Sequence, residues 1–239
     1  MNLIIDIGNT LTKLALVDNE DIVLIERYDN FNWATVEEIV DRYNVKKSIV
    51  SVVGVCNDEI LKKLRNKIPV LFFNPHTPVP IKNCYTTPHS LGVDRLAAAV
   101  GVSHLYPSVN ALCVDCGTAI TYDFITSKGE YMGGAISPGI TLRFKSLAHF
   151  TSKLPEVPFN EEYKLIGDST VDSILAGVLN GVVNEVDGYI SALKHQHPDL
   201  VVVFTGGDSI FFEKKLKNSI FVHPNIVILG LNRILNYNA

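Results

Sequence analysis

The sequence has few of the features that nucleic-acid-binding, membrane or secreted proteins need. Its 21 basic residues are outnumbered by 25 acidic ones, giving a net charge of −4, so we expect no broad basic surface for nucleic acid. The densest basic stretch, residues 62–67, has the pattern of one solvated helix face. No uncharged apolar run approaches the roughly 18 residues of a membrane helix. The first six residues lack the basic segment of a signal peptide.

Cysteine is also scarce, with 4 residues in 239, which is typical of a reducing compartment. We therefore expect a cytoplasmic protein. Cys113 and Cys116 have the spacing of a metal or redox pair, but they fall in an apolar run that predicts a strand, where residues three apart face opposite sides. The composition, 47% apolar and 19% charged, is that of a globular protein rather than a disordered one.

Short apolar segments alternate with helical patterns and predict an α/β protein. Strands are expected at 3–5, 14–17, 22–25, 48–53, 70–73, 111–114, 120–125, 131–136 and 200–204. Helices are expected at 33–43, 58–67, 93–105, 171–190 and 229–237. The four prolines of residues 74–90 predict a loop with a fixed path.

The opening pattern of the chain returns near its middle. Residues 6–10 and 115–118 each follow an apolar strand, and each combines a carboxylate, a glycine and a hydroxyl before another strand. An internal repeat of this kind fixes an architecture more firmly than either copy alone. We expect two α/β halves, residues 1–108 and 109–239, each with a mixed sheet that opens in a meander of three strands.

The long helix of the second half carries two further signals. Ser169 and Asp172 have the spacing of a capping box at its start. Gly177 and Gly181 lie four residues apart within it, although glycine destabilises helices. We expect these glycines to pack closely against another backbone, either a core helix or a second subunit.

Residues 6–13 have the composition of a phosphate-binding turn. Gly8 lets backbone N–H groups approach an anion, Asn9 and Thr10 add donors, and Lys13 adds a positive charge. A carboxylate beside bound phosphate is repulsive unless a cation lies between them, so Asp6 implies Mg²⁺, directly or through water. The alternative is an ordinary turn with a self-bonded aspartate.

Residues 115–123 form a second turn of this kind. Gly117, Thr118 and Thr121 are potential donors to phosphate, and Asp115 and Asp123 are potential cation ligands. Two such turns in two related halves indicate a nucleotide bound in a cleft between the halves.

Two glycine-rich segments suggest further contacts with small molecules. Gly206 and Gly207 follow a buried strand and would let a ring or ribose lie against the backbone; a plain strand-to-helix turn is the alternative. Residues 133–139 suggest backbone that lines a pocket, with the next helix presenting its N-terminus to it.

Residues 92–95, Gly-Val-Asp-Arg, allow two interpretations. Asp94 is either the N-cap of the following helix, with Arg95 on the surface, or a general base with Arg95 as a clamp for a substrate carboxylate.

In this order the motifs resemble the type III pantothenate kinases over essentially the whole chain. The motifs are Asp6-x-Gly-Asn-Thr-x-x-Lys13, Gly92-x-Asp-Arg95, Asp115-x-Gly-Thr-x-x-Thr-x-Asp123, Gly133-Gly-x-Ile-x-Pro-Gly139 and Thr205-Gly-Gly207. The resemblance implies an actin-like fold of the acetate and sugar kinase superfamily, built from duplicated ribonuclease H-like halves. It also implies ATP-dependent phosphorylation of pantothenate to 4'-phosphopantothenate, the first step towards coenzyme A. A homodimer and a monovalent cation, K⁺ or NH₄⁺, are implied as well.

The resemblance also assigns roles by position. Contacts to ATP fall on Asp6, Ile7, Gly8, Asn9, Thr10, Leu11, Thr12, Lys13 and Thr118, to which the chemistry of the turns adds Thr121, Gly206 and Gly207. Pantothenate contacts fall on Tyr85, Gly92, Val93, Asp94, Arg95 and Thr170. Asp94 is implied as the catalytic base and Asp115 as the ligand of the monovalent cation.

Three alternatives stay open from the sequence. One is another actin-fold kinase, for a sugar or a small acid. A second is a non-catalytic nucleotide-binding accessory protein, of the kind that resembles Bvg accessory factor, although the intact Asp6, Asp94 and Asp115 argue against loss of catalysis. The third is an actin-like filament protein.

Overall fold

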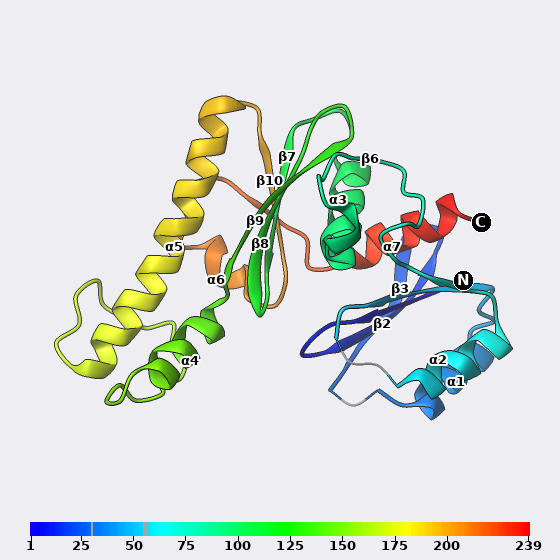
Figure 1. Ribbon diagram of the computed structural model, residues 1–239, viewed down its shortest axis with the longest axis horizontal. Coiled ribbons are helices and arrows are strands. Elements are labelled where there is room, and N and C mark those ends of the chain that lie inside the picture. Colours follow the sequence, from blue (N-terminus) through cyan, green and yellow to red (C-terminus); the bar gives the residue numbers. More distant parts are fainter. Residues whose placement is uncertain (30, 55–56) are drawn as a thin grey trace. The chain divides into compact units, whose positions relative to one another are not determined.

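The protein is built on two mixed β-sheets, which are covered by helices (Figure 1). The computed structural model describes residues 1–29, 31–54 and 57–239. Contacts divide the chain into two compact units. The first holds Met1–Pro107, Gly129–Tyr131 and Asn225–Ala239, and the second holds Ser108–Lys128 and Met132–Pro224. The C-terminal residues thus belong to the first unit, although they are the last in the chain. No helix in the described ranges is long and apolar enough to cross a membrane.

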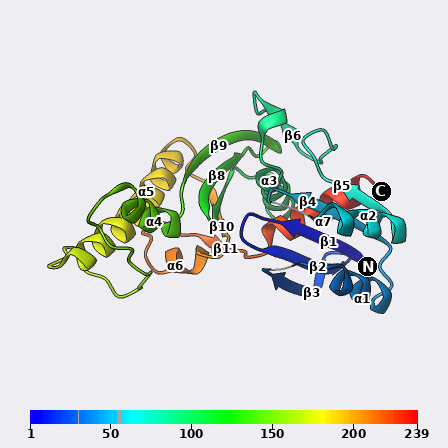
Figure 2. The same ribbon diagram turned by 60° about the horizontal axis from the view of Figure 1, so that its bottom comes forward.

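The sheet of the first unit has the order β3-β2-β1-β4-β5 (Figure 2). Its strands are β1 (Asn2–Ile7), β2 (Thr12–Asp18), β3 (Asp21–Tyr28), β4 (Lys47–Val52) and β5 (Val70–Phe72). The first three form an antiparallel meander, and β4 and β5 continue the sheet parallel to β1. All six residues of β1 are buried, which fits a central strand with a continuous apolar run.

In the described residues the first unit contains the α-helices α1, α2, α3 and α7, and α3 and α7 contact each other through their backbones. α1 (Trp33–Arg42) and α2 (Asp58–Lys67) bury one apolar face each. α3 (Val93–Leu105) packs closely on α7 (Ile226–Tyr237). A Cβ at Gly230 would lie 1.8 Å from the carbonyl oxygen of Ala97, and one at Gly101 2.4 Å from that of Ile226. This contact between glycines explains why the last helix joins the first unit.

The sheet of the second unit repeats the order of the first. Its order is β9-β8-β7-β10-β11, with β7 (Ala111–Cys116), β8 (Ala119–Ile125), β9 (Glu130–Pro138), β10 (Val201–Thr205) and β11 (Phe221–Val222). Again the second strand is antiparallel to the first, and the fourth and fifth run parallel to it. The predicted duplication of one α/β pattern is confirmed.

One short strand extends the second sheet. β6 (Lys82–Asn83) pairs with the first residues of β9, Glu130 and Tyr131, which are grouped with the first unit. The segment predicted as a loop over residues 74–90 therefore contains β6 and a single 3₁₀ turn at Pro88–Ser90.

The helices of the second unit are α4 (Ile140–Phe150), α5 (Thr170–Gln196) and the short α6 (Ser209–Glu213). α5 buries an apolar stripe that includes Leu175, Leu179 and Val182 against the second core. The predicted cap is confirmed, since the Asp172 N–H donates to Ser169 Oγ at 3.1 Å.

Three expectations from the sequence need correction. Residues 6–7 and 115–116 end strands β1 and β7 rather than forming part of the turns, because the ladder hydrogen bonds continue through them. α7 begins at Ile226, ahead of the expected residue 229. The close packing expected at Gly177 and Gly181 is wrong for a core helix, since a Cβ at either would meet nothing within 4 Å in the described chain. Both lie on an uncovered face of α5.

Candidate active site

Asp6 lies near the end of β1 with its side chain almost completely buried. It pairs across the sheet with Lys13 of β2 and with Ser51 of β4. Burial raises the pKa of Asp6, and the negative charge of Asp94 raises it further, while Lys13 and the Ser51 hydroxyl act in the opposite direction. Asp6 and Asp94 are therefore electrostatic neighbours, although 88 positions separate them in the sequence.

A tight turn follows β1 and rests on the end of β4. The Gly8 N–H donates to the Leu11 carbonyl oxygen at 3.0 Å, and the Val53 and Gly54 N–H groups donate to the Ile7 carbonyl oxygen at 2.9 and 3.2 Å. A Cβ at Gly54 would lie 2.2 Å from the Gly8 carbonyl oxygen. Glycine is therefore required where β4 ends beside the turn.

A hollow of about 350 Å³ borders this turn, lined by residues 7–12, Asp29 and the end of β4. Residues 9–11 are exposed there. Ile7 is only 3% exposed and packs in the core, so it can contact a ligand only through its backbone. The hollow is of a size suited to phosphate groups, and its polar turn residues are of the type that binds them.

Asp94 lies in the first turn of α3 and is not the N-cap. Gly92 occupies the cap position, and Asp94 Oδ1 accepts a hydrogen bond from the Arg95 N–H at 2.8 Å. A Cβ at Gly92 would lie 2.6 Å from Asp94 Oδ1, so the glycine leaves room for the carboxylate. The N-cap interpretation is wrong because the helix begins at Val93, two residues earlier than that interpretation requires.

Arg95 is buried, which also excludes the surface interpretation of this residue. Its guanidinium carbon lies 5.9 Å from the ring centroid of Tyr85, in cation–π range. The Tyr85 ring in turn lies 6.1 Å from that of Tyr131, and its backbone N–H donates to Asn83 Oδ1. The structure thus brings Tyr85 and Arg95 together, whereas Val93 is buried and offers only its backbone.

Asp115 occupies in β7 the position that Asp6 occupies in β1. It pairs with Thr205 of β10 and Thr121 of β8. A Cβ at Gly206 would lie 2.4 Å from both Asp115 Oδ1 and the Cys116 carbonyl oxygen, and Gly206 has a φ of +89°, which glycine adopts readily. A carboxylate and a carbonyl oxygen therefore lie close together at the end of β10.

The turn after β7 is held on two sides. The Asp208 N–H donates to the Cys116 carbonyl oxygen, and the Gly139 N–H donates to the Thr118 carbonyl oxygen, both at 3.0 Å. The Thr118 side chain is exposed and accessible to a ligand. Thr121 differs, because its hydroxyl donates to Asp123 Oδ2 at 3.0 Å and would have to exchange that bond to donate to phosphate.

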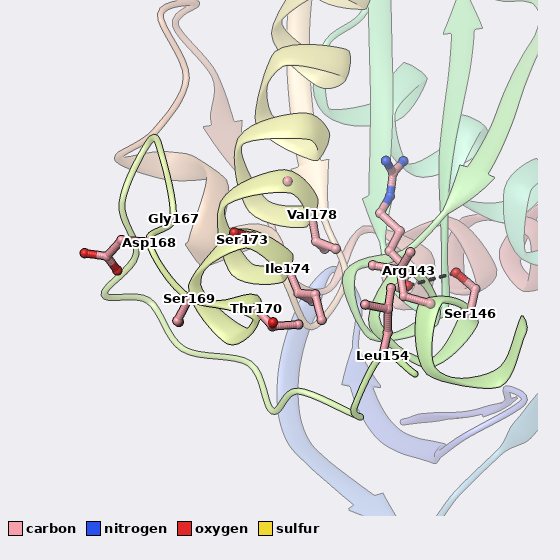
Figure 3. Close-up of a pocket in the computed structure, with 12 residues that line it drawn as sticks. Arg143, Ser146, Leu154, Gly167, Asp168, Ser169, Thr170, Ser173, Ile174 and Val178 are labelled. Carbon is pink, nitrogen blue, oxygen red and sulfur yellow. Dashed lines mark hydrogen bonds between the residues drawn. The ribbon is translucent and has the colours of Figure 1, made fainter. Parts of the chain in front are cut away.

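Thr170, the remaining predicted pantothenate contact, belongs to the second unit, whereas Tyr85 and residues 92–95 belong to the first. It is the first residue of α5 and lines a pocket of about 970 Å³ between α4, α5 and the segment that joins them (Figure 3). The pocket has apolar walls such as Ile174 and Val178 and a polar rim that includes Ser169.

The oxygen ligands present fit hard cations. Burial and, to a smaller extent, the charge of Asp94 raise the pKa of Asp6. A nearby cation, such as Mg²⁺ bound directly or through water, would favour its ionised form. The Asp115 carboxylate and the Cys116 carbonyl oxygen suit a monovalent cation. No group of three or more His, Cys, Asp or Glu residues with metal-binding geometry occurs in the described part of the chain.

Three residues beside these turns carry no motif in the sequence: Ser51, Gly54 and Asp29. Gly139 belongs to a predicted motif, but its contact with the second turn was not predicted. Ser51 could have been found from the repeat, since it corresponds to Thr205 on the parallel neighbour strand. Asp29 carries no local signal.

The two halves, which repeat one strand order, give the chain an actin-like fold, and solved sugar kinases share this fold. Solved structures with this fold include a Baf-family protein from Campylobacter jejuni, with a TM-score of 0.64 and 22% identity over 99% of this chain and 98% of that chain. A glucokinase from an Antarctic psychrotroph matches with a TM-score of 0.52 and 12% identity over 100% and 99%.

Sequence similarity narrows this class to one family. The model of the family described as type III pantothenate kinase matches residues 2–192. A type III pantothenate kinase from Bacteroides fragilis is 45% identical over 239 residues, covering 100% of this chain and 98% of the relative. The chain belongs to the type III pantothenate kinase family.

Proposed function

We propose that the chain carries out its family's reaction, the ATP-dependent phosphorylation of pantothenate to 4'-phosphopantothenate in coenzyme A biosynthesis, with Asp94 as general base. One observation supports the roles proposed for particular residues. The first turn of α3 places the Asp94 carboxylate beside the buried Arg95, whose guanidinium group faces the ring of Tyr85. Such a set can accept a proton and bind a small carboxylic acid.

In the proposed mechanism Asp94 accepts the proton of the primary hydroxyl of pantothenate. The oxygen then attacks the γ-phosphorus of ATP in line with the leaving group. Arg95 binds the pantothenate carboxylate, and Tyr85 packs beside the bound chain of the substrate. Phosphoryl transfer needs mainly positioning and charge neutralisation, which suits a site of backbone turns, one base and cations.

ATP contacts are proposed for both turns. Residues 6–13 and Thr118 bind phosphate oxygens, with Ile7 contributing only its backbone, and Gly206 and Gly207 lie along the nucleoside. Mg²⁺ near Asp6 would supply charge neutralisation for the phosphates. A K⁺ or NH₄⁺ ion at Asp115 is the second proposed cofactor.

We further propose that the protein is a homodimer in the cytoplasm. Phe150, Leu165 and Ile166, at the end of α4 and in the segment before α5, are 82%, 78% and 82% exposed. The open glycine face of α5 lies on the same unit. Exposed apolar side chains that gather into one patch commonly mark an interaction surface, so a second copy is proposed to cover these residues. Cys113 and Cys116 are buried free thiols, as a reducing compartment maintains them.

An ADP-release assay with a panel of acceptors tests the assignment. Pantothenate should be phosphorylated, and glucose and glycerol should react far more slowly because they lack the carboxylate that Arg95 binds. Arg95→Met should raise the KM for pantothenate and leave the KM for ATP nearly unchanged. Sugar turnover at equal efficiency would indicate another actin-fold kinase, and nucleotide binding without turnover would indicate an accessory protein.

A further inference from the structure

In the second unit, the side chain of Arg143 in α4 forms hydrogen bonds to both β9 and α5. Its Nε donates to the Pro138 carbonyl oxygen at 2.8 Å, and its Nη2 donates to Ser137 Oγ at 2.8 Å and to Glu185 Oε2 at 2.6 Å. Glu185 lies on α5, and its other carboxylate oxygen accepts from the hydroxyl of Tyr122 in β8 at 3.1 Å. One ion pair therefore connects the corner between β9 and α4 to both α5 and β8.

The pair is ionised and partly shielded from water. Arg143 and Glu185 are 20% and 35% exposed. Burial opposes the ionisation of Glu185, but hydrogen bonds from Ser137 and Arg143 and the charge of Arg143 outweigh burial and lower the pKa of Glu185. Hydrogen bonds between ionised groups are stronger than neutral ones. In Figure 3 the guanidinium group points away from the other labelled residues of the pocket, so a ligand there does not explain its placement.

The corner that Arg143 holds lies against the second phosphate turn. Gly139 donates its N–H to the Thr118 carbonyl oxygen at 3.0 Å, and the Arg143 N–H donates to the Gly139 carbonyl oxygen at 3.0 Å. A Cβ at Gly139 would lie 2.1 Å from the Gly117 carbonyl oxygen. The start of α4 thus contacts the turn through its backbone, and small shifts of this corner would move Thr118.

We propose that Arg143 and Glu185 are positioning residues for ATP, which hold Gly139 against the turn and so orient Thr118 toward the phosphates. The inference rests on the proposed function, in which Thr118 contacts ATP. Neither charged side chain needs to touch the nucleotide. We expect the effect to fall mainly on ATP, because Tyr85 and residues 92–95, which are proposed to contact pantothenate, belong to the other unit, and only Thr170 shares the second unit with Arg143.

The test compares nucleotide and acceptor affinity in Arg143→Lys and Glu185→Gln, which conserve size and polarity. We expect the KM for ATP, and the Kd of a non-hydrolysable ATP analogue, to rise about tenfold or more, because small misplacements of binding groups are costly. The KM for pantothenate should stay within about twofold. Lys63→Gln, which breaks an exposed ion pair with Glu59 on α2, is the matched control and should change neither value.

A third variant separates positioning from general stability. Arg143→Ala should regain ATP affinity when millimolar guanidinium is added, since the free cation can occupy the vacated position, whereas structural damage would not be reversed. Unchanged ATP affinity in the folded Lys and Gln variants, or an equal loss of affinity for ATP and pantothenate, would overturn the inference. If the unaltered chain binds the analogue but does not phosphorylate pantothenate, the proposed function fails, and the analogue affinities still decide the role of Arg143.

Discussion

The carboxylate of Asp94 lies near enough to that of Asp6 for its charge to raise the pKa of Asp6. One of these groups ends a central strand and the other begins a helix, so the sheet and α3 bring two negative charges to one place. Two carboxylates held close together in this way are typical of sites where a cation binds beside them or where one of them accepts a proton.

Asp94→Asn separates the catalytic role of this carboxylate from a structural one. We expect kcat to fall by roughly 10²–10⁴, the usual effect of losing a general base. The melting temperature should change little, because Gly92 rather than Asp94 holds the cap position and the lost repulsion with Asp6 offsets the lost charge in the first helical turn. Activity, melting temperature and ATP binding are measured on one preparation. A folded variant with near wild-type kcat would remove Asp94 from the mechanism.

The monovalent cation provides a second prediction. Activity should be low in Na⁺ buffer and recover with K⁺ or NH₄⁺, because the Asp115 carboxylate and the Cys116 carbonyl oxygen are the proposed ligands of a large monovalent ion. Asp115→Ala should reduce activity in every salt. Rates of ADP release in matched chloride buffers provide the measurement, and equal rates in Na⁺ and K⁺ would contradict the assignment.

The contact between α3 and α7 predicts opposite effects of two glycine substitutions. Gly230→Ala should destabilise the protein by about 1–3 kcal/mol, the cost of overpacking, because its Cβ would lie 1.8 Å from the Ala97 carbonyl oxygen. Gly188→Ala, on an open face of α5 with nothing within 4 Å, should stabilise by about 0.5–1 kcal/mol through helix propensity. Denaturant unfolding measures both, and equal effects would show that the close contact is absent.

Glu185 predicts a pH-dependent contribution to stability. Its pKa is lowered in the folded protein, so the folded state binds the proton more weakly than the unfolded state. The stabilisation is therefore complete above the ordinary value of 4.5 and is lost as the pH falls through the lower folded value. Glu185→Gln should lower the melting temperature at pH 7, and the difference should shrink below pH 4.5. A difference that is constant with pH would show that the charge plays no part.

The proposed dimer is tested on its exposed apolar side chains. Ile166→Asp should convert the protein to a monomer in sedimentation velocity, because a charge would be buried at the interface. Val23→Asp, at a residue of β3 that is 49% exposed, should leave the assembly unchanged. A monomer for the unaltered chain, or a dimer for Ile166→Asp, would reject this surface.

Most helices and strands could be predicted from the sequence, because the spacing of apolar residues that indicates each one lies within a short segment. The helix at residues 58–67 was predicted to the residue. The repeated turns predicted two related halves that each open in a meander of three strands, and the two sheets show this. The pairing of α7 with α3 was not predictable, since it depends on glycines more than 120 positions apart that allow backbone contact.

The candidate site was predicted in part for a similar reason. Residues within one turn, such as Gly8 and Lys13, follow from composition. The cap rule failed at Asp94 because glycine is also accepted at an N-cap, and here Gly92, two residues earlier, occupies that position while Arg95 is buried. Helix propensity identifies Gly177 as an unfavourable residue within a helix. It gives no information on whether another part of the protein packs against this position.

The two units share one strand order but differ in the charge that lies beside the carboxylate of the central strand. Each central strand carries a carboxylate at its fifth residue, beside a hydroxyl on the parallel neighbour: Asp6 with Ser51, and Asp115 with Thr205. On the antiparallel side the partners differ, since Asp6 faces Lys13 and Asp115 faces Thr121. The first copy thus includes its own positive charge, whereas the second has a neutral hydroxyl in that place. A cation bound from solution at Asp115 would supply the positive charge that Lys13 provides beside Asp6 in the first unit.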